Sequence, residues 1–419
     1  MTVYYCTNEP QIQYTRFASV RRKINVVLLF LFVLNALFVP ADPFEVKKLA
    51  MFALLVLNCD SFWRMRAKDE RWIFLVGTVL TTVTILISIL WTGNIVENIS
   101  LGYVGYILLL YPIIRQYRID FVKMVIHVLT LMSYFIVIMG LLDLIGFISV
   151  YDNPYLMWLA DSKNAMVGKG SHLPIGFAIF MKASPMIFLG IAYSFLNPKS
   201  FLAPYSFTKL KFVNAAVMCL AMVLSGTRAN MFLCLFFAAF CAVYQIKSQV
   251  KRNTFIFAMF VLLLFFLGDG ALLNSIVDMF IRKASSDAVR NDTLDSILAV
   301  WEKNPRSLLL GSGYSATFYN TGRGEYVSSV EISYWNLLRQ VGLFLFVAMM
   351  AMYLYPAMKM LKEQKNTLII LAYVAYLGVA YTNPLLFSST GMTLLLFMYC
   401  LCFDDIDYEK ETIEEGLLS

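Results

Sequence analysis

The sequence predicts an all-α polytopic membrane protein with about twelve transmembrane helices. Hydrophobic residues make up 60% of the chain and charged residues only 15%, and the mean hydropathy is +0.69. Soluble domains carry roughly 25% charged residues, so this composition excludes an ordinary soluble fold. Lys and Arg gather in short clusters between apolar runs, as in the cytoplasmic loops of membrane proteins. The net charge of +7 therefore reflects orientation in a bilayer, and we expect no nucleic-acid partner.

Twelve apolar runs come close to the roughly 20 residues that a helix needs to cross a bilayer. The first run leads into further spans and lacks the small-residue cleavage site of a signal peptide. We therefore expect it to be a span, and the twelve spans lie near 24–40, 47–62, 72–91, 99–114, 121–150, 173–196, 211–227, 229–246, 253–269, 335–357, 367–382 and 386–403.

The positions of the basic clusters predict that both termini are cytoplasmic. Every short loop that this orientation assigns to the inside contains Lys or Arg, for example Arg21–Lys23 and Arg64–Arg71. The outer segments 92–98 and 383–391 contain neither residue. Lys47 and Lys48 are an exception, because they stand at an outer end.

The chain reads as a single integral membrane domain over 1–419 with two longer outer segments. Residues 151–172 form a first periplasmic loop, and residues 270–334 form a long periplasmic loop between helices 9 and 10. Amphipathic helices are expected in the long loop over 272–280 and from Asn291 or Asp292 to before Pro305. An acidic cytoplasmic tail follows at 404–419. Nearly all of the seven cysteines lie in apolar runs, which predicts no structural disulfide.

A few ionisable residues lie at membrane depth, where such residues are functional candidates by default. Arg228 follows Ser-Gly-Thr between two apolar runs; it either snorkels to the interface or holds a phosphate through paired hydrogen bonds. Lys182 is placed in the middle of the span 173–196, as a functional group or as the structural partner of Asp143. His127 reads as a packed or interfacial side chain.

The outer segments supply further polar candidates. Arg290, Arg323, Glu331 and Arg339 belong to the long loop and the start of the span after it, and His172 closes the first loop. If the helix extends outward, Glu331, Trp335 and Arg339 share a face. In the GSGYSA stretch at 311–316 no Gly-Lys-Ser/Thr follows, so we predict a turn and no nucleotide site. Metal-binding motifs are absent, and no cofactor is expected.

Taken together, these residues resemble a family. The chain has twelve spans, SGTRAN at the start of the eighth, and a long loop with Arg290, then WEKNPRSLLLGSGYS, then VEISYWNLLRQVGLF. This order is similar to that of the O-antigen polymerase and ligase superfamily (Wzy and WaaL types). The motifs cover about residues 215–350, and the topology covers the whole chain.

The resemblance implies an enzyme of the bacterial inner membrane that acts on undecaprenyl-diphosphate-linked oligosaccharide repeat units at the periplasmic face. A polymerase of this family transfers the growing chain to a new repeat unit, with lipid diphosphate as the leaving group. Arg228 and Arg290 would then stabilise the departing charge, and Glu331 is the candidate base. Arg323, Arg339, Lys182 and His172 would help to bind substrate, and Tyr334 and Trp335 would stack on sugars. Each also has a structural reading: a solvated Glu331, and aromatic rings that simply pack.

Two other functions stay open. Ligases of the superfamily use the same donor with lipid A core as acceptor and typically have His where this chain has Glu331. A flippase or transporter also fits twelve spans, although the long loop is confined to one half of the chain and no internal repeat is visible. The resemblance further makes partnership with a chain-length regulator and a flippase plausible.

Overall fold

The computed structural model describes residues 16–63, 65, 68–169, 177–195, 211–246, 248–254, 257, 288–381 and 383–403. The first half of the described chain is mostly helical. Its elements are α1 (Arg16–Phe38), α2 (Val46–Leu57), α3 (Cys59–Trp63), α4 (Lys68–Thr92), α5 (Ile95–Gly102), η1 (Tyr103–Leu109), α6 (Leu110–Gln116), α7 (Phe121–Leu144), α8 (Pro154–Asp161), β1 (Ala165–Lys169), β2 (Phe177–Met181), η2 (Ser184–Met186) and α9 (Ile187–Ser194).

The second half adds helices and a short hairpin. Its elements are α10 (Lys211–Leu224), α11 (Arg228–Gln245), α14 (Arg306–Leu310), β3 (Phe318–Asn320), β4 (Glu325–Val327), α15 (Ser333–Lys362), α16 (Thr367–Ala380) and α17 (Ser389–Cys402). A further helix covers 288–303 and ends before Pro305, which agrees with the helix predicted there. The predicted helix over 272–280 and the acidic tail lie outside the described residues.

Four helical segments within the described residues are long and apolar enough to cross a membrane. They are Lys68–Thr92, Ile95–Gln116, Phe121–Leu144 and Ser333–Lys362. Five shorter apolar helices accompany them, at Ser184–Ser194, Phe212–Leu224, Leu233–Tyr244, Thr367–Ala380 and Ser389–Cys402. The fold is therefore that of a mainly helical protein suited to a membrane, while twelve spans remain a prediction.

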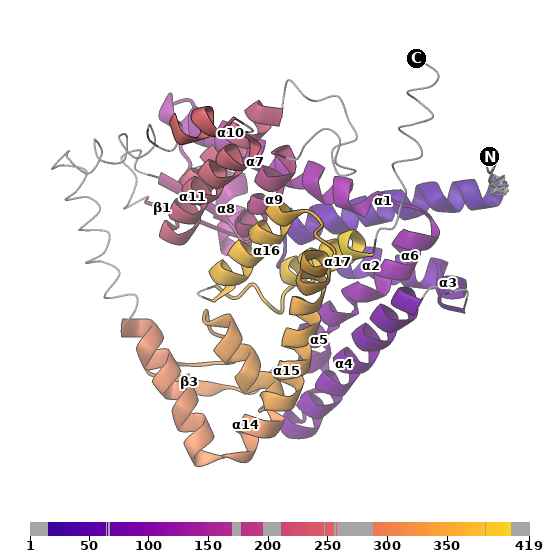
Figure 1. Cartoon of the computed structure of the whole chain (residues 1–419). Coiled ribbons are helices and arrows are strands. Elements are labelled where there is room, and N and C mark those ends of the chain that lie inside the picture. Colours follow the sequence, from indigo (N-terminus) through magenta and orange to yellow (C-terminus); the bar gives the residue numbers. More distant parts are fainter. Residues whose placement is uncertain are drawn as a thin grey trace.

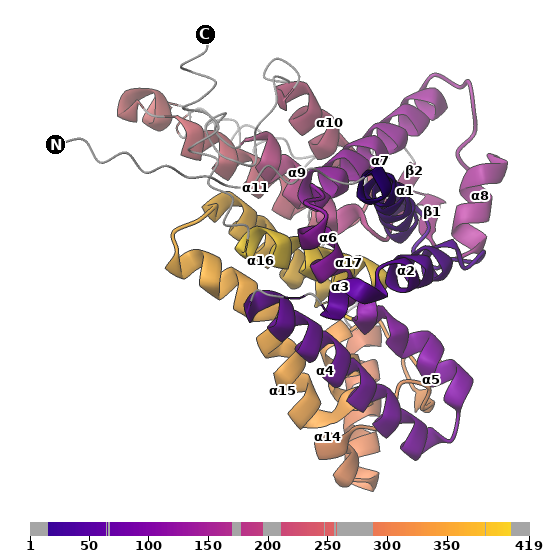
Figure 2. The same ribbon diagram turned by 90° about the vertical axis from the view of Figure 1, so that its right-hand side faces the viewer.

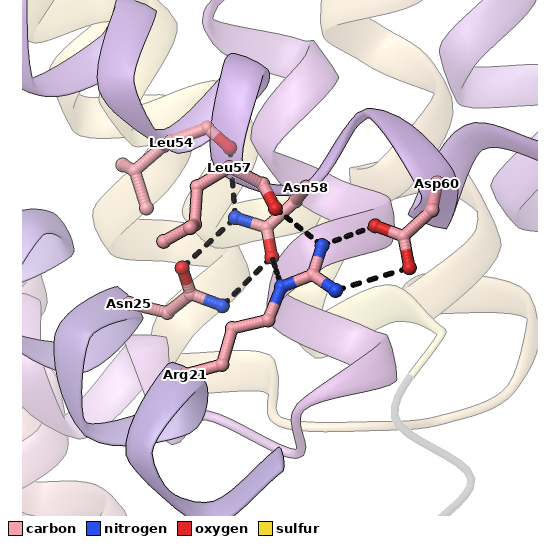
Figure 3. A network of polar contacts seen from close by, with 6 residues as sticks. All are labelled: Arg21, Asn25, Leu54, Leu57, Asn58 and Asp60. Atoms are coloured by element: carbon pink, nitrogen blue, oxygen red, sulfur yellow. Dashed lines mark hydrogen bonds and ion pairs between the residues drawn. The ribbon is translucent and has the colours of Figure 1, made fainter. Parts of the chain in front are cut away.

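Contacts at one end of the helices join segments that were all predicted to lie inside. Arg21 on α1 donates from Nε to Asn58 Oδ1 at 3.1 Å and forms an ion pair with Asp60, as Figure 3 shows. The side-chain amides of Asn25 and Asn58 donate to each other's oxygens at 2.9 and 2.8 Å and are fully buried. This reciprocal pair ties α1 to the end of α2, and a buried amide pair is stable because both partners are satisfied.

Arg115 adds further contacts at the same end of the molecule. Its Nη1 lies 2.9 Å from Asp69 Oδ2 and also donates to the carbonyl of Phe403 at the end of α17. Arg22 donates to the Tyr117 carbonyl at 3.1 Å. Segments that are far apart in the sequence, the earliest at Arg21 and the last at Phe403, therefore meet at this end of the molecule.

Segments predicted to be outer converge at the other end. Ser315 donates its backbone N–H to Asn98 Oδ1 at 3.1 Å, and Ser333 Oγ donates to the Asn383 carbonyl. Ser389 Oγ donates to the Pro40 carbonyl at 3.4 Å. These contacts gather the loops at two ends of the molecule, while the assignment of either end to the cytoplasm is a prediction from the charges.

Residues 288–332 form a small folded unit, which we call the cap. In Figures 1 and 2 the cap, in orange, lies beside the ends of α4 and α15, away from the α1, α7 and α10 body. It contains its own apolar cluster, built from Ile297, Trp301, Phe318, Val330 and Ile332. Burial of these side chains gives the long loop a core of its own, so it is a folded element and not an open connection.

The predicted span 335–357 corresponds to α15, which is interrupted at Gly342. Gly342 has φ +79° inside the helix, and a Cβ there would lie 2.3 Å from the Gly311 nitrogen. Gly311 also has positive φ, and the Ser312 and Gly313 N–H groups donate to the Arg339 and Gln340 carbonyls at 2.9 Å. Two glycines therefore let the chain after α14 lie directly against the α15 backbone.

The prediction of a helix through 173–196 was wrong. Residues 165–169 and 177–181 pair as an antiparallel hairpin, with Ala165 opposite Met181. Helical structure resumes only at Ser184, and Pro185 stands in its first turn. Proline favours a helix start and disfavours helix before it, and a five-residue apolar run cannot by itself distinguish strand from helix. The described chain is otherwise mostly helical, which is consistent with the predicted all-α class, and its two short hairpins, β1–β2 and β3–β4, are the local departures from it.

Candidate functional site

Glu331 and Arg323, two of the predicted site residues, form an ion pair on the cap surface. Arg323 Nη2 donates to Glu331 Oε1 at 2.9 Å, and the Glu331 side chain is 49% exposed. Oε1 carries this contact, and Oε2 has no hydrogen-bond partner among the described residues. The carboxylate is thus oriented by one contact, while its other oxygen is able to accept a proton from a bound hydroxyl.

Arg290 is carried to the same surface by the helix over 288–303. A Cβ on Gly322 would lie 2.5 Å from the Val289 carbonyl, so the turn that contains Arg323 sits directly on the helical turn that contains Arg290. Arg290 and the Arg323–Glu331 pair therefore stand on neighbouring backbone segments of the cap although they are far apart in the sequence, and the Arg290 side chain is half-buried.

Hydroxyl and amide groups hold this turn against the helix. Thr293 Oγ1 donates to Asn320 Oδ1 at 3.1 Å, and Thr321 Oγ1 donates to the Asp292 carbonyl at 2.9 Å. Asn320 is fully buried and also accepts from the Gly322 N–H at 2.9 Å. Because these bonds fix the backbone over the three residues before Arg323, the charged group stands on a rigid support.

Arg339 lies beneath the cap surface and does not face solvent. Its side chain is 1% exposed, and it donates to the carbonyls of Ala316 at 3.1 Å and Ser328 at 2.6 Å. The guanidinium stacks over Phe318, 4.6 Å from the ring centroid. These contacts identify Arg339 as a clamp between α15 and the cap. The geometry favours this structural role over the predicted role in substrate binding.

The two aromatic candidates are packed. Tyr334 donates its hydroxyl to the Leu377 carbonyl at 2.8 Å, and Trp335 packs against Trp301 with centroids 6.0 Å apart. Both side chains are half-buried. The structural reading of packed rings fits these contacts better than sugar stacking.

The glycine-rich stretch after α14 is a docking turn. Tyr314 is buried, stacks on Phe387 with centroids 5.4 Å apart, and donates its N–H to Ser88 Oγ at 3.2 Å. A Cβ on Gly313 would lie 2.8 Å from Thr92 Cγ2 at the end of α4. This turn therefore fastens the cap to the outer end of α4 and α5.

Lys182 belongs to a second group of charges, away from the cap. It follows β2, outside the four long apolar helices, and its N–H donates to the Asn164 carbonyl at 3.2 Å. Asn164 is fully buried and accepts from the Ala41 N–H at 2.6 Å, which joins this hairpin to the α1–α2 turn. Burial, and next the nearby Lys163, lower the pKa of Lys182. The alternative partner Asp143 instead accepts from the Val150 N–H at 2.7 Å.

Lys47 and Asp42 complete that group and were not candidates from the sequence. Lys47 is 2% exposed and donates from Nζ to the Pro40 carbonyl at 2.8 Å. Asp42, also buried, accepts from the N–H groups of Lys47 and Lys48 at 3.1 to 3.3 Å. The only signal in the sequence was that Lys47 and Lys48 broke the charge pattern of the outer side.

The remaining candidates are described in part. Arg228 is the first residue of α11, and a Cβ on the preceding Gly226 would lie 2.4 Å from Ala178 Cβ on β2. The start of α11 is therefore close to the β1–β2 hairpin, while the Arg228 side chain and His172 lie outside the described residues. His127 is exposed, and its Nδ1 is hydrogen-bonded to the Lys123 carbonyl at 2.7 Å, which fits the interfacial of the two predicted positions.

Comparison with known proteins finds no matching protein-family model and no matching curated protein. Among the residues that the structure describes, no three His, Cys, Asp or Glu side chains gather as metal ligands. The described residues thus contain two groups of charged side chains that are considered below. The cap group consists of Arg290, Arg323 and Glu331, and the lysine group consists of Lys47, Lys163 and Lys182.

Proposed function

We propose that this chain is a membrane glycosyltransferase that polymerises undecaprenyl-diphosphate-linked oligosaccharide repeat units at the periplasmic face of the bacterial inner membrane. The product is O-antigen or a related surface polysaccharide. The proposal includes twelve spans and cytoplasmic termini. Its main support is the juxtaposition of an available carboxylate, Glu331, with Arg323 and Arg290 on a cap that is fixed to an apolar helical body.

The proposed reaction needs an acid–base group and stabilisation of a leaving diphosphate. An acceptor sugar hydroxyl attacks the anomeric carbon of the donor, and the bond from that carbon to the diphosphate oxygen breaks. Glu331 accepts the hydroxyl proton, and the electron pair leaves with the diphosphate. Arginine suits that anion because its guanidinium stays charged and pairs with phosphate oxygens in a bidentate way. Arg290 on the cap is the proposed partner of the diphosphate beside Glu331, and Arg228, at the start of α11 near the β1–β2 hairpin, is proposed as a second partner from the sequence resemblance alone.

The test is complementation of a strain from which the gene has been deleted, read out as the length distribution of surface polysaccharide. We expect the wild-type gene to restore long chains and Glu331→Gln to leave single repeats on the lipid core. General-base removal typically lowers a rate by 10²–10⁴-fold, which no increase in expression compensates. Glu325→Gln is the matched control, since Glu325 is an exposed acid on β4 of the same cap.

The outcomes separate the alternatives. Single repeats in the deletion strain identify a polymerase, whereas complete loss of attached sugar indicates a ligase or a flippase. Arg228→Ala and Arg290→Ala are expected to behave as Glu331→Gln does, with exposed Arg306→Ala as control. Full-length polymer from both arginine variants would overturn the diphosphate assignment.

A further inference from the structure

The lysine group contains more positive charge than the described residues balance. Lys47, Lys48, Lys163 and Lys182 come from the α1–α2 turn and the β1–β2 hairpin, which Asn164 joins. Lys48 is neutralised by Glu45 at 2.7 Å, and Asp42 is the buried carboxylate beside Lys47. The ammonium groups of Lys163 and Lys182 have no hydrogen-bond or ion-pair partner within the described part of the chain.

Hydrogen bonds hold the segments that carry these lysines together. Lys47 Nζ donates to the Pro40 carbonyl at 2.8 Å, and the next residue, Ala41, donates its N–H to Asn164 Oδ1 at 2.6 Å. The Asn164 carbonyl accepts from the Lys182 N–H at 3.2 Å, and Lys163 directly precedes Asn164. Like charges brought together under partial burial are unfavourable in the empty protein, and an anion with several oxygens would relieve that repulsion.

An apolar surface begins next to the charges. On α2, Leu49 and Phe52 are 64% and 66% exposed, and Val56 continues the same helical face one turn further. Phe44, in the turn before α2, stacks on Trp158 of α8 with centroids 5.9 Å apart. A positively charged group at the outer end of an exposed apolar stripe matches a lipid, whose anionic headgroup meets the charges and whose chain follows the stripe.

We propose that Lys47, Lys163 and Lys182 form a binding site for the phosphate headgroup of a membrane lipid. Lys163 and Lys182 contact the phosphate oxygens, and Lys47 supplies positive charge from behind them. The site does not depend on the proposed glycosyl transfer and is separate from the cap group. The shared chemistry is a lipid phosphate, which an isoprenoid diphosphate or an anionic phospholipid supplies.

The experiment measures lipid binding to the purified full chain in detergent by native mass spectrometry. The probes are undecaprenyl diphosphate and phosphatidylglycerol, with inorganic pyrophosphate as a competitor. We expect the double variant Lys163→Gln/Lys182→Gln to bind lipid at least about tenfold more weakly, because charge-assisted contacts to phosphate are lost. Lys303→Gln, an exposed lysine of the cap, is the control for a loss of one positive charge.

The kind of lipid that the site binds is identified by which lipid loses affinity in the double variant. Weaker binding of undecaprenyl diphosphate alone assigns the site to a lipid-linked substrate, and weaker binding of both lipids assigns it to anionic lipid in general. Lys47→Met is measured beside the double variant, with thermal melting to confirm that each variant is folded. Unchanged affinity for both lipids in folded variants overturns the site, whatever the polysaccharide phenotype is.

Discussion

Arg339 shows how one residue can have a different use from the one its charge suggests. Its position near Glu331 and Trp335 in the sequence favoured substrate binding, yet it is almost wholly buried and donates to two cap carbonyls. A guanidinium can satisfy several carbonyls at once because its donors are arranged in a rigid planar fork. Only the path of residues 316–328 over α15 reveals this role.

Replacing Arg339 by Met is expected to destabilise the cap by about 2–3 kcal/mol, since the Ala316 carbonyl would be buried without a donor. Lysine is not expected to rescue the loss, because one ammonium cannot reproduce the fork. The measurements are thermal melting of the purified protein and limited proteolysis within 288–332. Exposed Arg306→Met serves as the control, and equal protease resistance of Arg339→Met and wild type would contradict the clamp.

At the scale of elements, α15 joins the cap to the helical body through a break at Gly342. The amino-terminal part of α15 carries Arg339 and packs with the cap, and the part after Gly342 continues as an apolar helix. Positive φ is unfavourable for residues with a Cβ by roughly 1–2 kcal/mol, and here the Gly311 backbone also fills the space that a side chain would need.

Gly342→Ala is therefore expected to lower stability by more than about 1 kcal/mol and to loosen the α14–α15 contact. The matched control is Gly378→Ala in α16, where a Cβ would meet nothing within 4 Å. Alanine there should be neutral or stabilising by up to about 1 kcal/mol, because it is the better helix former. Thermal melting of the two variants side by side checks the prediction, which fails if they melt alike.

At the scale of the whole molecule, both ends of the helical body carry charged side chains. One end gathers arginines with acids and carbonyls, as in the Arg21–Asp60 and Arg115–Asp69 pairs. The other end joins hydroxyl and amide groups, as in Ser315 with Asn98, and also carries the Arg323–Glu331 ion pair. The cytoplasmic position of the first end is therefore a prediction from the basic loops of the sequence.

The orientation is testable by labelling single cysteines with a membrane-impermeant maleimide in a cysteine-free background. Glu325→Cys on β4 and Gln364→Cys after α15 are both at exposed positions. We expect Glu325→Cys to react in spheroplasts and Gln364→Cys to react only after the membrane is permeabilised. Reaction of both from the same side would refute the alternating topology.

The sequence by itself determined the helical membrane class and the approximate bounds of helices such as α4 and α10. These properties depend on composition and on local runs of apolar residues. It missed the β1–β2 hairpin because a short apolar run suits strand and helix equally. It missed the break at Gly342 because that break depends on the close approach of the Gly311 backbone from another segment. It also gave no sign that Lys47 would be buried at the turn before α2.

Only the tertiary structure decided which charged residues meet. Arg323 pairs with Glu331, Arg339 turns inward, and Asn164 joins the Lys182 backbone to the turn before α2. Such contacts depend on how segments far apart in the chain pack, as when Ser315 meets Asn98 across 217 positions. Local hydropathy carries no information on that packing, whereas side-chain fit and buried hydrogen bonds determine it.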